Sequence, residues 1–130
     1  MLVLRLQHAS VLRPPGEAAR AEALRFYVDI LGCREVPKPS TFDRIDTIWF
    51  RCGDDEIHLL AAPPGEQIAR SGPHFCLVCD DLAAMRSRLE TAGFPCEEAT
   101  PIPGRPRFMT RDPFGNQIEI TVIENEPSST

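Results

Sequence analysis

The sequence predicts an α+β fold built from two copies of one unit, in which a strand and a helix are followed by three more strands. The predicted elements follow this order twice along the 130 residues. A glycine ends both predicted helices, at Gly32 and at Gly93. A glycine-led segment also recurs near the end of each half, and it aligns Ile57 with Ile118 at an offset of 61. Self-similarity of this kind indicates an internal repeat.

The first half supplies the elements of one unit. Leucines at alternate positions predict a first strand over residues 2–12. Apolar residues near helical spacing predict a helix over residues 17–31. A short strand over 33–36 follows, and the turn at Gly53-Asp54 joins two longer strands over 45–52 and 56–61.

The second half repeats these elements. A strand is predicted over 74–79, a helix over 82–92 and a short strand over 94–98. A hairpin over 107–122 turns at residues 112–116, and Glu119 then lies on the face opposite Ile118 and Ile120. Residues 124–130 are predicted to be a frayed tail. We therefore expect one domain over 1–130, with a first module at 2–62 and a second at 73–123.

The composition excludes several classes of protein. Hydrophobic residues make up 42% and charged residues 25%, which is typical of a soluble globular domain. A net charge of −5 without a basic run argues against nucleic-acid binding. The sequence contains no signal peptide and no apolar run that would span a bilayer, so we expect a cytoplasmic protein without a membrane partner. The five cysteines give no disulfide framework, and Cys76 and Cys79 are expected to be buried free thiols.

The repeat brings all three histidines and one glutamate to equivalent positions. His58 corresponds to Glu119, and His8 corresponds to His74. A pseudo-twofold arrangement of the two modules would bring these four side chains to a common centre. Imidazole and carboxylate groups are the usual ligands of zinc, iron, nickel and manganese. The pattern therefore predicts a divalent metal site.

Four segments of the chain resemble the vicinal oxygen chelate superfamily, which includes glyoxalase I, bleomycin resistance proteins, fosfomycin resistance enzymes and extradiol dioxygenases. The segments are residues 24–32, 57–59, 74–78 and 112–119. The resemblance covers nearly the whole chain and implies that paired βαβββ modules form a curved mixed sheet around a cavity. It also implies metal ligands at His8, His58, His74 and Glu119.

The chain departs from glyoxalase I at one ligand position. Glyoxalase I carries a glutamate where His58 stands, and its two glutamates move a proton between neighbouring carbons. The set of His8, His74 and Glu119 is more similar to the His-His-Glu triad of the fosfomycin enzymes and dioxygenases. His58 is then a fourth ligand, a second-shell group, a general base or a residue of the cavity wall.

The resemblance implies two classes of function. The first is a metal-dependent lyase, isomerase or dioxygenase, in which the metal stabilises an oxyanion or enolate of a small substrate with vicinal oxygens. The second is a metal-free protein of the bleomycin resistance type that sequesters a ligand. Arg105 and Arg107 either bind a carboxylate or phosphate of the small molecule or belong to a solvated loop. Members of the family commonly form dimers, so we expect a homodimer.

Overall fold

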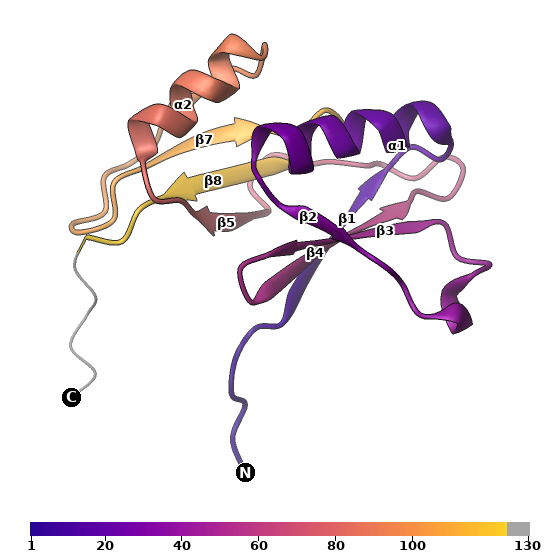
Figure 1. Ribbon diagram of the computed structural model, residues 1–130. Coiled ribbons are helices and arrows are strands. Elements are labelled where there is room, and N and C mark those ends of the chain that lie inside the picture. The colour runs from indigo at the N-terminus through magenta and orange to yellow at the C-terminus, as the bar shows by residue number, and fades with distance from the viewer. Residues whose placement is uncertain (125–130) are drawn as a thin grey trace. The chain divides into compact units, whose positions relative to one another are not determined.

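The computed structural model describes residues 1–124, and the chain clusters into two compact units that divide between Ala69 and Arg70 (Figure 1). Each unit holds one four-stranded mixed sheet and a main helix, which confirms the predicted α+β class. Of the predicted tail over 124–130, residues 125–130 lie outside the described residues.

The first unit has its strands in the order β1-β4-β3-β2. Its elements are β1 (His8–Arg13), α1 (Glu17–Ala23), the π-helical η1 (Leu24–Ile30), β2 (Arg34–Val36), the 3-10 helix η2 (Ser40–Phe42), β3 (Thr47–Cys52) and β4 (Asp55–Ala61). β1 pairs with β4 in parallel, and the other two pairs are antiparallel.

The second unit has the matching order β5-β8-β7-β6. Its elements are β5 (His74–Val78), α2 (Leu82–Thr91), β6 (Glu97–Glu98), β7 (Arg107–Arg111) and β8 (Gln117–Thr121). β5 pairs with β8 in parallel, and β7 is antiparallel to both of its neighbours. The side chain of Asp81 caps α2 by accepting a hydrogen bond from the backbone N–H of Ala84 at 3.0 Å.

One face of each sheet forms the core. In the first unit Tyr27 of η1 stacks on Phe50 of β3, with ring centroids 5.2 Å apart, and both residues are fully buried. In the second unit Phe108 and Ile118 are buried in the same way. Since side chains alternate along a strand, residues next to these core positions point to the opposite face. We call this opposite face the helix-free face of each sheet.

The parallel strand pairs have the same register in the two units. His58 of β4 lies opposite Ser10 of β1, and Glu119 of β8 lies opposite Cys76 of β5. His8 and His74 each lie two residues before these partners on the same face of β1 and β5. The four residues therefore occupy equivalent positions within their own sheets.

The first strand is shorter than the sequence predicts. β1 begins at His8 rather than at residue 2, and Leu2, Leu4 and Leu6 are exposed. A strand needs a neighbour to satisfy its backbone groups, and β4 begins only at Asp55, opposite the start of β1. Alternating leucines before His8 thus have no sheet to join within the first unit.

The predicted helix over 17–31 changes type within its length. It is α-helical as far as Ala23 and π-helical from Leu24 to Ile30. The N–H of Leu31 bonds the carbonyl of Phe26, five residues earlier, at 2.9 Å. The wider turn buries Phe26 and Tyr27 together, and apolar spacing in the sequence does not distinguish it from an α-helix.

The expectation of no disulfide was wrong for one pair of cysteines. Cys33 and Cys52 form a disulfide with their Cα atoms 4.9 Å apart. They stand one position beyond the paired residues Arg34 and Arg51, so the β2–β3 ladder itself brings them together. Cys76 and Cys79 are free thiols as predicted, but neither is buried, because Cys76 is exposed and Cys79 is partly exposed.

Candidate functional site

Three aromatic rings stack across the helix-free face of the first sheet. The rings of His8 and His58 lie with their centroids 4.2 Å apart and their planes at 17°. On its other side, His58 stacks on Trp49 at 4.3 Å and 7°. Trp49 of β3 is directly opposite His58 in the ladder, so the register of the sheet builds this stack. The stack fixes the planes of both imidazoles.

Hydrogen bonds distinguish the two histidines of the first unit. Nδ1 of His8 lies 2.6 Å from the amide oxygen of Gln7, an acceptor, so this nitrogen donates and Nε2 carries the lone pair. His58 instead uses Nε2, which lies 2.9 Å from Oε1 of Glu56. Glu56 also accepts a hydrogen bond from Arg51 at 2.7 Å. The bond to His58, and then the bond to Arg51, hold the pKa of Glu56 below its ordinary value.

The second unit pairs His74 with Glu119. Nδ1 of His74 donates to the carbonyl oxygen of Gly72 at 2.6 Å, and Nε2 lies 3.1 Å from Oε1 of Glu119. The distance between Nε2 of His74 and Oε1 of Glu119 is that of a hydrogen bond, which joins the two side chains directly.

Glu119 is buried and has further partners. Its side chain is 11% exposed, and Nη1 of Arg107 donates to the same Oε1 at 3.0 Å. Nε and Nη2 of Arg107 donate to the carbonyl of Thr100 at 3.0 and 2.8 Å, which anchors the guanidinium. Although Cys76 is exposed as a residue, partial burial of its thiol, followed by the charge of Glu119 opposite it, raises the pKa of Cys76 to about 11. The guanidinium of Arg107 therefore compensates the charge of the buried Glu119 carboxylate.

The four predicted metal ligands lie in two pairs, one in each unit. It brings His8 to His58 in the first unit and His74 to Glu119 in the second. Within residues 1–124, His, Cys, Asp and Glu side chains form no group of three or more arranged to hold a metal ion.

The two arginines singled out in the sequence lie in different surroundings. Arg107 begins β7, is 16% exposed and pairs with Glu119, so it does not belong to a solvated loop, which was one of its two predicted settings. Arg105 lies in the loop before β7 and is exposed. Sequence reasoning did not single out Glu56, which stands two residues before His58 and therefore shares its face of β4. That spacing was the available signal for this residue.

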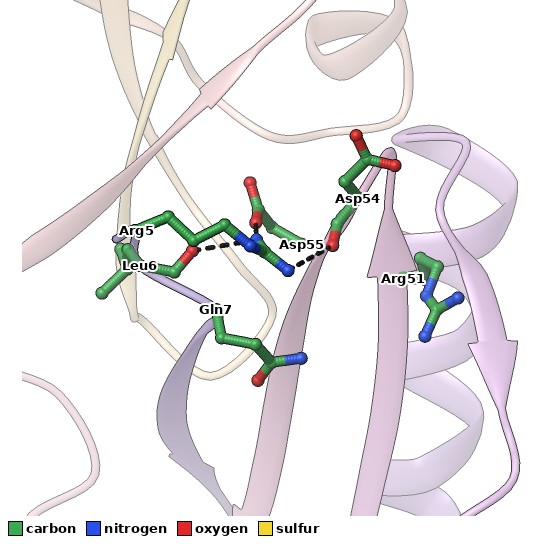
Figure 2. A pocket seen from close by; sticks show the side chains of 6 residues that line it. All are labelled: Arg5, Leu6, Gln7, Arg51, Asp54 and Asp55. Atoms are coloured by element: carbon green, nitrogen blue, oxygen red, sulfur yellow. Dashed lines mark hydrogen bonds and ion pairs between the residues drawn. The ribbon is translucent and has the colours of Figure 1, made fainter. Parts of the chain in front are cut away.

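A cavity adjoins the residues around His8 in the first unit. It has a volume of about 710 Å³ and is open to solvent. Figure 2 shows its lining, which consists of Arg5, Leu6, Gln7, Arg51, Asp54 and Asp55. Arg5 pairs with Asp55 and reaches the carbonyls of Leu6 and Asp54. Gln7 links the cavity to His8, and Arg51 links it to Glu56.

The chain matches a known protein family. Residues 20–120 match the model of the Glyoxalase/Bleomycin resistance protein/Dioxygenase superfamily. No curated protein sequence matches the chain. A putative glyoxalase family protein from Bacillus anthracis is 27% identical over 95% of this chain and 98% of its own, with a TM-score of 0.85.

Two further solved structures share the fold at lower identity. The fosfomycin resistance protein FosX from Listeria monocytogenes is 12% identical over 93% of this chain and 94% of its own, with a TM-score of 0.72. TnmS3, an antibiotic binding protein from Streptomyces sp. CB03234, is 22% identical over 95% of this chain and 98% of its own, with a TM-score of 0.67. The same fold therefore occurs in a fosfomycin resistance protein and in an antibiotic binding protein.

Proposed function

Because the chain belongs to the Glyoxalase/Bleomycin resistance protein/Dioxygenase superfamily, we propose that it is a divalent-metal-dependent enzyme acting on a small substrate with vicinal oxygens. Members of this superfamily bind small molecules, and divalent metals are common among them. The observation that carries the proposal is the equivalent placement of His8 with His58 and His74 with Glu119 on the helix-free faces of two sheets with one register. In this proposal the chain is one domain made of two modules, at 2–62 and 73–123.

We assign the metal to His8, His74 and Glu119. Both histidines have Nδ1 tied to an oxygen acceptor. Nε2 of His8 is then left for the metal, whereas Nε2 of His74 would bind the metal in place of its present contact with Glu119. The hydrogen bond at Nδ1 is the usual support of a metal-binding histidine. His58 has its Nε2 committed to Glu56, so it joins as a fourth ligand only after that bond opens. With that bond closed, His58 orients the ring of His8.

The proposed chemistry follows from a metal with open coordination positions. When bound, the ion would act as a Lewis acid toward two adjacent oxygens of the substrate and stabilise a developing oxyanion or enolate. The donors are nitrogen and oxygen atoms, a set that zinc, iron, nickel and manganese all accept. The cavity beside Gln7 would receive the rest of the substrate, and Arg105 is free to approach an anionic group on it. Lyase, isomerase and dioxygenase reactions all fit this scheme.

A second function has its own supporting observation. Arg107 and His74 already satisfy the buried carboxylate of Glu119 through hydrogen bonds, so the carboxylate does not require a metal ion. A metal-free protein that sequesters a ligand, of the bleomycin resistance type, fits that arrangement. TnmS3, which shares the fold, is described as an antibiotic binding protein.

The proposal includes assembly and location. We propose a homodimer in the cytoplasm, with a small molecule as the partner and no part for nucleic acid or membrane. No helix within residues 1–124 is long and apolar enough to cross a membrane. Light scattering at micromolar concentration should give the mass of a dimer, and the mass of a monomer would contradict the assembly.

Elemental analysis tests the choice between the two functions. The protein would be purified without added metal and without chelators, in parallel with a His8→Ala and Glu119→Gln double variant. A metal content in the natural protein that the double variant lacks supports the enzyme. Equal, near-zero contents that stay so after dialysis against zinc, iron, nickel and manganese favour the metal-free binder.

A further inference from the structure

We propose that residues 1–7 form an interface with a second copy of this chain, in which the two segments pair as antiparallel strands centred on Leu4. This inference rests on the homodimer of the proposed function, and it goes further by assigning the surface through which the two copies meet. It does not depend on a bound metal ion.

The segment before β1 exposes large apolar side chains to solvent. At least 78% of the surface is exposed for each of Met1, Leu2, Val3, Leu4 and Leu6. At roughly 100 Å² of apolar surface for each side chain, five from each of two copies amount to about 1,000 Å². A specific interface between two proteins needs an area of about this size. The segment is therefore large enough to hold two copies together.

The first sheet provides no neighbour for this segment. The pairing of β1 with β4 starts at His8, which lies opposite Glu56. β1 is also the edge strand of its sheet. Within residues 1–69, all of which the structure describes, no strand runs beside residues 2–6. A strand from outside the first unit can therefore pair with their backbone groups.

The segment is anchored at its base. The carbonyl of Gln7 accepts a hydrogen bond from the backbone N–H of Glu56 at 3.1 Å. The guanidinium of Arg5 pairs with Asp55 and donates to the carbonyl of Asp54 at 3.4 Å (Figure 2). A segment that is already held near its sheet loses less conformational freedom on pairing than a free tail does.

The sequence of the segment fits an antiparallel copy of itself in one register. Pairing about Leu4 puts Leu4 opposite Leu4 and Leu2 opposite Leu6, so the leucines of both copies share one face. A slip of one residue would put Leu4 opposite Val3 or Arg5. A slip of two residues either puts Arg5 opposite Arg5, which repels, or leaves Leu6 without a counterpart.

This self-complementarity identifies the partner. A two-fold axis through the Leu4 pair gives both copies the same contacts, so the assembly closes as a dimer. A strand of unrelated sequence would match the backbone but not the alternating leucines. The segment therefore fits a second copy of this chain.

Cysteine cross-linking tests both the partner and the register. Leu4→Cys would put two thiols opposite each other with their Cα atoms about 5 Å apart, which suits a disulfide. Leu2→Cys is the matched control, because its thiol would lie roughly 14 Å along the ribbon from the same thiol of the other copy. Under mild oxidation Leu4→Cys should shift to twice the polypeptide mass in non-reducing electrophoresis. Leu2→Cys should stay at the background of the natural protein, whose free cysteines are Cys76, Cys79 and Cys96.

Light scattering at micromolar concentration gives a second test. Leu4→Asp should have the mass of a monomer, because it sets two like charges opposite each other. Val78→Asp, at an exposed apolar residue of the second unit, is the control and should remain a dimer.

The outcomes separate this inference from the proposed homodimer. A natural protein with the mass of a monomer overturns both. A dimer that persists in Leu4→Asp, or equal cross-linking of Leu4→Cys and Leu2→Cys, overturns the assigned surface and leaves the homodimer standing.

Discussion

Nε2 of His74 lies 3.1 Å from Oε1 of Glu119, although the two residues are 45 positions apart in the sequence. The parallel ladder between β5 and β8 produces this contact, because it sets Glu119 beside Cys76, which is two residues from His74 on the same face of β5. Both residues lie in the second unit, and both are proposed metal ligands.

Replacing Glu119 should weaken metal binding strongly. Glu119→Gln keeps the shape of the side chain and an acceptor for Arg107, but it removes the charge that attracts a cation. We expect the affinity for a divalent metal ion to fall by about 100-fold. This is the upper end of the loss that follows when only a hydrogen-bond partner of a metal ligand is changed. Competition with a chromophoric chelator would measure it. Glu97→Gln in the exposed strand β6 is the control and should bind metal like the natural protein; equal losses in the two variants would rule out Glu119 as a ligand.

Glu56 should stabilise the first unit in a pH-dependent way. Its pKa in the folded protein is below the ordinary value of 4.5, because of the bonds from His58 and Arg51. A lowered pKa stabilises the fold at pH values above the ordinary pKa, and this contribution disappears as the pH falls through the folded value. Glu56→Gln should therefore be less stable than the natural protein at pH 7, by about 1 kcal/mol.

Urea unfolding at several pH values would check this prediction. The difference between the natural protein and Glu56→Gln should shrink as the pH is lowered below about 4.5. Glu66→Gln, in an exposed loop, should show no such difference at any pH. If the difference in unfolding free energy between Glu56→Gln and the natural protein stays the same at every pH, the variant acts through packing and not through the charge of Glu56.

Two neighbouring leucines in β4 should differ sharply in their contribution to stability. Leu59 is fully buried on the core face, and Leu60 on the helix-free face is 37% exposed. Leu59→Ala should cost about 2–5 kcal/mol, because it leaves a cavity in the core. Leu60→Ala should cost well under half as much. Denaturant unfolding monitored through Trp49, the single tryptophan, measures both, and similar losses would contradict the assigned faces of β4.

The disulfide should stabilise the first unit. Cys33 and Cys52 close a loop with a sequence separation of 19, and cross-linking a loop of about this length contributes roughly 3 kcal/mol. Reduction with a dithiol, or the Cys33→Ser and Cys52→Ser double change, should lower the unfolding free energy by a similar amount. Cys96→Ser, at a free cysteine, is the control. A natural protein whose stability does not respond to reductant would show that the cross-link is not formed in solution.

The sequence predicted those features that depend on local patterns. Alternation of apolar residues in the hairpin correctly put Ile118 and Ile120 in the core and Glu119 on the opposite face. The repeat likewise anticipated that His58 and Glu119 hold equivalent positions in their ladders. Side-chain alternation is a property of each strand by itself, so it can be read from one segment at a time.

The features that the sequence missed depend on which strands become neighbours. The start of β1 at His8 is set by where β4 begins, and the Cys33–Cys52 bridge is set by the register of β2 on β3. The stack of Trp49 on His58 also requires that register. None of these pairings has a signature within a single segment.

Metal content is the most direct measurement of the central claim, that His8, His74 and Glu119 hold a divalent ion. Elemental analysis of the natural protein, purified without added metal, should find a transition metal in an amount close to that of the polypeptide. The His8→Ala and Glu119→Gln double variant should lose it while keeping its fold. A natural protein that carries no more metal than this variant, and takes up none on dialysis against metal salts, would contradict the claim and leave the metal-free ligand-binding function in its place.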